Sequence, residues 1–290
     1  MAYEPNSLEP DGPRESSDRG FRTYPRSEGG GALRVRPASF ADHYSQARLF
    51  YVSQTGSEQN HIVAALVFEL SKVEGAAIRE RMVSNLVNVD ADLAARVATG
   101  LGLPEMPAAS PTTVPARKNP TPSPALSIHL NAKPTIEGRS VGCIVTDGAD
   151  GPLFDALKKA VTAAGARLVV IAPKIGGVKR SDGKQLAADA ALVGAPSVLF
   201  DAVVVLASSE GGAMLAKEGA AVDFVRDAFA HLKVVGTTKG AGALFRAAGL
   251  GDKKDAGVIA LEDRDGVDAL VRASKKQRIW SREPDVRNVP

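Results

Sequence analysis

The sequence predicts a mixed α/β protein, in which an N-terminal arm and a small all-α segment precede a proline-rich linker and a flavodoxin-like, doubly wound parallel sheet. Three observations indicate this fold. Apolar residues recur at helical spacing within residues 39–103, seven prolines crowd residues 104–125, and apolar runs alternate with helical stretches from residue 126. Apolar strands separated by helices are typical of a parallel sheet covered on both faces, and right-handed crossovers then give the doubly wound arrangement.

Residues 1–38 are predicted to form an extended arm. Proline, glycine and charged residues interrupt every apolar run there, so the segment can bury little apolar surface by itself. The glycines at positions 29–31 follow no strand and precede no helix start. They are therefore interpreted as a turn and not as a phosphate-binding loop.

The helical segment, residues 39–103, begins with two helices. The first is capped by Ser39 or Asp42 and ends near residue 52. Thr55 and Glu58 have the spacing of a capping box, which predicts the start of the second helix. An apolar stripe follows at helical spacing, formed by Ile62, Leu66, Val67 and Leu70.

Two more helices are predicted in the same segment. Gly75 separates the second from the third, Asp90 can cap the fourth, and Gly102 is a natural left-handed stop. About sixty-five residues bury little surface on their own. We therefore favour an appendage that packs on larger protein over an independent four-helix bundle.

Residues 104–125 are predicted to be a linker, because proline lacks an amide donor and stiffens an extended chain. From residue 126 onward the elements of a flavodoxin-like domain follow in order. Strands are expected at residues 140–146, 167–172, 201–206, 233–238 and 257–261, helices at 153–164, 213–229, 241–248 and 264–276, and a hairpin turn at 181–184.

Composition excludes several classes of protein. The formal net charge is +3 over 290 residues, without a basic run or an aromatic-rich basic strand, so nucleic acid is a poor partner. The first residues lack the apolar core of a signal peptide, and the apolar run at 62–70 is too short to span a bilayer. A lone cysteine, Cys143, implies no disulfide. A cytoplasmic protein that binds no membrane is expected.

Two sets of residues resemble known families. Residues 3–8 (YEPNSL), 19–22 (RGFR) and 40–51 (FADHYSQARLFY), continued by 61–73 and 78–82, resemble the stretch of haem catalases just after the β-barrel, namely the wrapping arm and C-terminal helices. Residues 201–205, 224–229, 233–236 and 247–250 resemble the ThiJ/PfpI class of glutamine-amidotransferase-like (class I) proteins. Large-subunit catalases (clade 2) carry such a domain after a linker.

The resemblance implies that the parent enzyme contains haem, forms a homotetramer and dismutates hydrogen peroxide in the oxidative stress response. The distal His, the nearby Asn and the proximal Tyr of that family would lie upstream of residue 1. Residues 48–55 (RLFYVSQT) are similar to the proximal signature, but Tyr51 stands one position early and Gln54 replaces the expected Asp. One residue rotates a helical side chain by about 100°. We therefore expect no haem in this chain and no activity of the chain alone.

A vestigial ThiJ/PfpI-type site is a further hypothesis. That family places a cysteine on a strand-to-helix turn, where a helix N-terminus lowers the thiol pKa. The corresponding turn begins at Thr238 and Lys239, without a thiol, and Asp147 stands where relatives place a catalytic acid. Catalysis by these three residues is the less favoured interpretation. A solvated lysine and a turn-forming aspartate explain them more simply.

The histidines do not indicate a metal site. His43, His61, His129 and His231 show no pairing at ligand spacing, and the cysteine is far from each in sequence. His61 lies beside the apolar stripe of its helix. It is interpreted as part of an interface with another segment.

The favoured function is that of a non-catalytic C-terminal part of a haem catalase, which supports the tetramer and contacts the β-barrel region and other subunits. One alternative is a chaperone-like or binding module for unfolded client proteins, using Ala/Val-rich surface that the barrel would otherwise cover. A second alternative is a weak ThiJ/PfpI-type hydrolase at Thr238 and Asp147. Because the chain starts directly before the arm motif, a truncated reading frame or a piece cut from a longer protein is expected.

Overall fold

The computed structural model describes residues 34–251 and 253–287. The chain divides into two units, Met1–Ala41 and Asp42–Pro290. In the first, the described residues hold one 3-10 turn, η1 (Ala38–Ala41). The arm motifs at 3–8 and 19–22 and the glycines at 29–31 lie outside the described residues.

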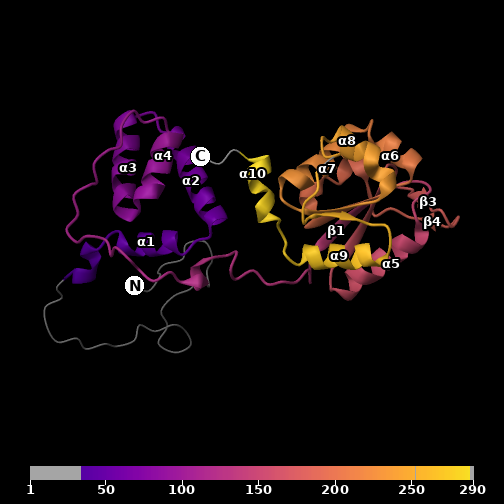
Figure 1. Cartoon of the computed structure of the whole chain (residues 1–290), viewed down its shortest axis with the longest axis horizontal. Coiled ribbons are helices and arrows are strands. Elements are labelled where there is room, and N and C mark those ends of the chain that lie inside the picture. Colours follow the sequence, from indigo (N-terminus) through magenta and orange to yellow (C-terminus); the bar gives the residue numbers. More distant parts are fainter. Residues whose placement is uncertain (1–33, 252, 288–290) are drawn as a thin grey trace, which may run out of the picture. The chain divides into compact units, whose positions relative to one another are not determined.

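Four helices open the second unit: α1 (Ser45–Val52), α2 (Gly56–Ser71), α3 (Ala76–Val89) and α4 (Ala91–Gly100), as Figure 1 shows. Thr55 and Glu58 form the predicted capping box at the start of α2. The Asp90 carboxylate accepts the first free amides of α4. Gly102 ends this helix with a φ of +64°, a conformation that glycine adopts without strain. The predicted helix boundaries are therefore confirmed to within a few residues.

The helical segment has its own apolar core. Val63 of α2, Val83 of α3, and Ala94 and Val97 of α4 are all 0% exposed. Tyr51 of α1 packs in the same cluster. Each helix thus contributes one apolar stripe to a shared interior.

The proline-rich residues lie along these helices and do not behave as a free spacer. Ser110 hydrogen-bonds the side chain of Ser84 at 2.8 Å, and the Ser123 amide donates to the Ser53 hydroxyl at 2.9 Å. The Arg48 guanidinium donates to the Lys118 carbonyl at 2.9 Å. Hydrogen bonds with side chains provide partners for backbone amides and carbonyls of this extended segment, which has no neighbouring strand to pair with among the described residues. The boundaries at 103/104 and 125/126 remain predictions.

A six-stranded parallel sheet follows, in the order β5-β2-β1-β6-β7-β8. Its strands are β1 (Ser140–Val145), β2 (Arg167–Ala172), β5 (Ala190–Ala191), β6 (Ala202–Leu206), β7 (Val234–Thr237) and β8 (Val258–Ala260). Without the two-residue edge strand β5, this is the flavodoxin-like order that the sequence predicts. The predicted hairpin at 181–184 is also present, joining β3 (Val178–Lys179) to antiparallel β4 (Gln185–Leu186).

Helices cover both faces of this sheet (Figure 1). The alternate side chains of β1 explain why: Cys143 and Val145 enter one core cluster, and Ile144 enters the other. The covering helices are α5 (Gly151–Ala163) and α9 (Arg264–Ser274) on the first face, and α6 (Ser209–Leu215), α7 (Gly219–Ala230) and α8 (Gly242–Ala247) on the second. The chain continues to α10 (Glu283–Val286).

One predicted helix is wrong. Residues 213–229 form two helices, because Ser208 caps α6 several residues earlier than predicted and α7 begins afresh at Gly219. The polar residues Lys217 and Glu218 separate them, which the apolar pattern alone did not reveal. The short elements β5 and α10 were not predicted either, since two to four residues carry too little periodicity to be recognised.

Candidate functional site

The carboxyl ends of β1 and β6 mark the point where strand order reverses, which is where ligands bind in open α/β sheets. Ser208, after β6, organises this edge. Its amide donates to the Thr146 hydroxyl at 3.2 Å, and its own hydroxyl donates to the Asp147 carbonyl at 2.7 Å and accepts from the Gly211 amide at 3.1 Å. The loop after β1 is thereby tied to the first turn of α6.

Asp147 lies at the outer side of this edge and forms a turn. Its carboxylate accepts the Lys179 amide at 2.7 Å, while the Gly148 amide donates to the Lys179 carbonyl at 2.8 Å. Gly148 has a φ of +75°, which only glycine adopts readily. These bonds attach β3 to the loop after β1, which favours the turn-forming interpretation of Asp147.

Thr238 follows β7, and its hydroxyl is occupied by main-chain groups. It donates to the Ala207 carbonyl at 3.1 Å and accepts from the Ala207 amide at 3.2 Å. Its φ of −95° and ψ of 161° are ordinary extended values, unlike the strained turn of an exposed nucleophile. A Cβ at Gly240 would collide with the Ala207 carbonyl, and a Cβ at Gly212 with the Gly240 carbonyl. The backbone of helix α6 thus packs directly against the turn that begins at Thr238.

Lys239 points to solvent. Its side chain is 87% exposed and its ammonium lies 3.5 Å from Glu262, itself 54% exposed. An exposed pair of this kind contributes little to stability. The position agrees with a solvated lysine.

Two separate cavities open at this edge of the sheet. Asp147 lines one of about 370 Å³ together with Lys174 and Glu210. Thr238 and Lys239 line another of about 420 Å³, together with Phe245, Arg246 and Glu262. The structure therefore does not bring the three sequence-predicted residues into one pocket.

Cys143 lies in the centre of β1 and is 0% exposed. Burial raises the pKa of its thiol to about 12. The thiolate is the reactive form, so this cysteine is a small apolar core residue at neutral pH.

Tyr51 is the residue that the similarity to the proximal signature singles out as a possible iron ligand. It is 4% exposed, and its hydroxyl lies 3.5 Å from the Asp92 carboxylate. Burial raises the pKa of the Tyr51 hydroxyl, which opposes the phenolate that binds iron. The residue does not fit a haem-ligating role. Among the described residues, no group of three or more His, Cys, Asp and Glu side chains is placed to hold a metal ion.

The sequence did not indicate a polar cluster that joins α2 to the chain after the linker. The Glu58 carboxylate accepts the Ser127 hydroxyl at 2.7 Å and the amides of Ile128 and His129 at 2.8 and 3.1 Å. The His129 ring stacks on Trp280 at 3.9 Å between centroids. The capping box identified Glu58 locally, but no sequence signal reported its partners seventy residues away.

Across the part of the chain that the structure describes, we find no helix with both the length and the apolarity to cross a membrane.

Comparison with known proteins gives the family. Residues 37–101 match the family described as "Catalase-related immune-responsive", and residues 137–284 match the "C-terminal domain found in long catalases". Catalase C of Rhizobium meliloti (strain 1021) is 50% identical over 285 residues, which are 98% of this chain and 40% of that protein. Catalase HPII of Pseudomonas putida is 40% identical over 295 positions, covering 100% of this chain and 40% of the relative.

A more distant relative, Catalase-2 of Bacillus subtilis (strain 168), is 30% identical over 275 residues, 94% of this chain and 38% of its own length. The chain thus spans about two fifths of the length of these curated relatives. The second family match extends over half of the chain and coincides with the flavodoxin-like sheet and its helices. The chain therefore belongs to the long-catalase family, and residues 137–284 are the C-terminal domain of that family.

Proposed function

We propose that this chain is a non-catalytic part of a catalase subunit that supports the assembly of the whole enzyme. The peroxide reaction, the haem and the homotetramer belong in this proposal to the complete protein. One observation carries it: large apolar side chains on the helical segment face solvent. Phe50 is 47% exposed, Phe68 61% and Ile78 54%. Side chains of this size are expected to be covered by another protein surface.

The state of the candidate site supports the same proposal. The Thr238 hydroxyl is bound to main-chain groups of Ala207, and Asp147 opens onto a different cavity. A nucleophile needs a base within hydrogen-bond reach and an approach for the substrate. The geometry therefore favours a supporting role over the hydrolase alternative.

Mixing the chain with a partial relative tests the supporting role. The partner is Rhizobium meliloti Catalase C produced without the residues that align to this chain. Size-exclusion chromatography with light scattering should show a complex, and co-expression should increase the yield of soluble, haem-loaded oligomer. The chain alone should show no Soret band and no peroxide-dependent oxygen release. Haem-dependent turnover by the isolated chain contradicts the proposal.

Matched variants make the test specific. Phe68→Ser with Ile78→Ser should weaken the complex about tenfold or more, since tenfold corresponds to about 1.4 kcal/mol and the two substitutions together remove at most about 4 kcal/mol of apolar contact. Ile175→Ser, at a residue 63% exposed on the α/β domain, serves as the control and should leave the complex unchanged. Equal weakening by the control would mean that the helical segment is not the contact surface.

A chaperone-like function is a second candidate, favoured by exposed apolar side chains in the segment before β6. Val193 is 86% exposed, Val198 65% and Leu199 61%. Exposed apolar side chains can bind apolar segments of an unfolding protein. The full chain should then suppress the thermal aggregation of a client enzyme, followed by light scattering. The triple serine variant at these positions should lose this effect. Equal suppression by an inert protein would count against the candidate.

A further inference from the structure

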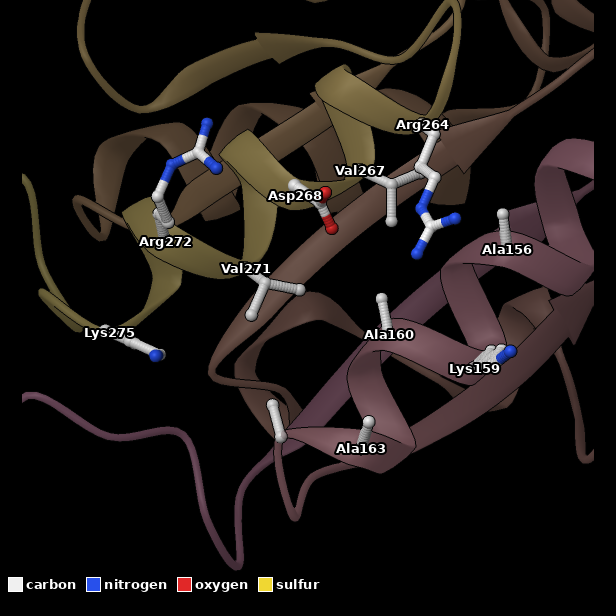
Figure 2. Close-up of a pocket in the computed structure, with 11 residues that line it drawn as sticks. Ala156, Lys159, Ala160, Ala163, Arg264, Val267, Asp268, Val271, Arg272 and Lys275 are labelled. Carbon is white, nitrogen blue, oxygen red and sulfur yellow. The ribbon is translucent and has the colours of Figure 1, made fainter.

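A groove of about 510 Å³ runs between α5 and α9 on one face of the α/β domain (Figure 2). Its floor is made of short apolar side chains from both helices. These are Ala156, Ala160, Ala163 and Ala164 of α5 and its C-terminal end, and Val267 and Val271 of α9. Ala156, Ala160, Ala164 and Val271 are only half-buried, so part of this apolar floor is accessible.

The spacing of these residues explains the shape of the groove. Positions 156, 160 and 163 lie on one face of α5, and positions 267 and 271 lie on one face of α9. Both helices follow strands that run in the same direction, so the two faces extend side by side. Alanine is too short to fill the space between them. An apolar groove between two helices can receive the apolar face of a third, amphipathic helix.

Cationic side chains surround the apolar floor. Lys159, Arg264, Arg272 and Lys275 line the groove, against a single carboxylate, Asp268. None of these five side chains forms a hydrogen bond or salt bridge with another residue in the described ranges 34–251 and 253–287. In Figure 2, Arg264 and Asp268 extend from α9 toward α5. The groove therefore carries an excess of three positive charges, and these charges have no partners among the residues that the structure describes.

The spacing of the cationic residues indicates which kind of ligand fits the groove. Arg264 and Lys275 lie eleven positions apart, about 16 Å along a helix. A ligand with one anionic head cannot reach both ends, whereas carboxylates spaced along a helix can. No described helix of this chain carries more than two acidic residues, which favours a different polypeptide over a second copy.

We infer that the α5–α9 groove binds an amphipathic helix of another polypeptide, with its apolar stripe on the alanines and its flanking Asp and Glu residues beside the cations. The apolar floor provides contact area, and the charges provide orientation and selection of an acidic partner. This inference does not depend on the supporting role proposed above.

A synthetic peptide tests the inference with the full chain. The probe is a fluorescein-labelled helix of roughly eighteen residues, about 27 Å long, with Leu at one helical stripe and Glu on both flanks. The control peptide has the same leucines and Lys in place of Glu. Fluorescence anisotropy should show saturable binding of the Glu peptide, weakened by salt. The Lys peptide should bind at least about tenfold more weakly.

Two protein variants locate the site. Arg264→Glu with Lys275→Glu reverses the charge at both ends of the groove and should weaken binding about tenfold or more. The matched control, Lys158→Glu with Lys276→Glu, changes the net charge equally at exposed residues of the same region that do not line the groove. It should bind as the unaltered chain does. Ala160→Phe fills the groove and should also abolish binding, with circular dichroism and thermal melting used to check folding.

Several results would overturn the inference. Equal loss in the Lys158/Lys276 control would indicate general charge attraction, and equal binding of both peptides would remove the selection of acidic partners. Absence of saturable binding would also reject it. If the chain alone forms a dimer that the Arg264/Lys275 variant disrupts, the occupant is a second copy and the proposed partner is wrong.

Discussion

The His61 ring and the Glu283 carboxylate meet at 2.5 Å, between Nε2 and Oε1, although 222 residues separate them in the chain. Glu283 is 2% exposed, and its Oε2 atom has no partner among the described residues. Arg287 lies 3.5 Å from Oε1. Trp280 contacts both histidines of this junction, tilted against His61 at 5.6 Å and stacked on His129. The contact connects α2 to α10.

His61→Ala should destabilise this junction, because it leaves the buried Glu283 carboxylate without its closest donor. We expect a loss of about 1.5–3 kcal/mol, the range for hydrogen bonds to charged groups. Urea unfolding followed by Trp280 fluorescence measures it, since that indole lies at the junction. Glu283→Gln in the His61→Ala background should restore part of the loss. Equal stability of His61→Ala and the parent chain would show that the contact contributes nothing.

Glu58 makes stability depend on acid pH. Burial raises the pKa of its carboxyl, but hydrogen bonds from Thr55, Ser127 and His129 outweigh burial and lower that pKa from 4.5 to about 2. Because the folded pKa lies below the unfolded one, the stabilisation is fully present above about pH 5 and disappears as pH falls from 4.5 toward 2. A pKa shift of this size corresponds to a contribution of about 3 kcal/mol at most to the free energy of unfolding. The free energy of unfolding, measured across this pH range, should depend less on pH in Glu58→Gln than in the unaltered chain. The same pH dependence in both proteins would contradict the assignment.

Arg282 fixes the C-terminal segment. Its side chain is 0% exposed, donates to both Asp255 oxygens at 2.6 and 2.8 Å, and stacks on Phe229 at 4.0 Å. Asp255→Ala removes the carboxylate that accepts both of these hydrogen bonds. It should lower the free energy of unfolding by about 3–5 kcal/mol. Arg282→Lys should also destabilise, since an ammonium cannot make the bidentate contact. Asp223→Ala, which breaks an exposed pair with Arg226, is the control and should have a small effect in thermal melting.

Thr238 should matter for stability and not for chemistry. Thr238→Val keeps the shape and removes the hydroxyl that bonds Ala207, which should cost about 1–2 kcal/mol in chemical denaturation. Thr238→Ser keeps the hydroxyl and should lose less. If any esterase or glyoxalase activity of the chain is measured and disappears in Thr238→Val at unchanged stability, the hydrolase alternative is supported instead.

Cys143 should resist alkylation in the folded chain. Its thiol is fully buried with a pKa raised to about 12, so almost no thiolate exists at pH 8. Iodoacetamide should label it slowly, followed by mass spectrometry, and rapidly once guanidinium unfolds the chain. Fast labelling under native conditions would mean that β1 opens to solvent.

Most secondary structure was predictable because its determinants are local. The Thr55–Glu58 capping box, the Asp90 cap and the glycines after helices all act within a few residues, and the structure confirms them. The alternation of apolar strands and helices likewise predicted the parallel sheet. The division of residues 213–229 into two helices was missed because both halves have apolar residues at helical spacing.

The sequence by itself determined the elements, the fold class and the family resemblance, because these depend on near neighbours and on hydrophobic period. Only the tertiary structure decided what the polar side chains do. It directed the Thr238 hydroxyl to Ala207, joined His61 to Glu283, and left a cation-lined groove between α5 and α9. The physical reason is that such contacts depend on how distant segments pack, and the spacing of residues along the chain does not specify that packing.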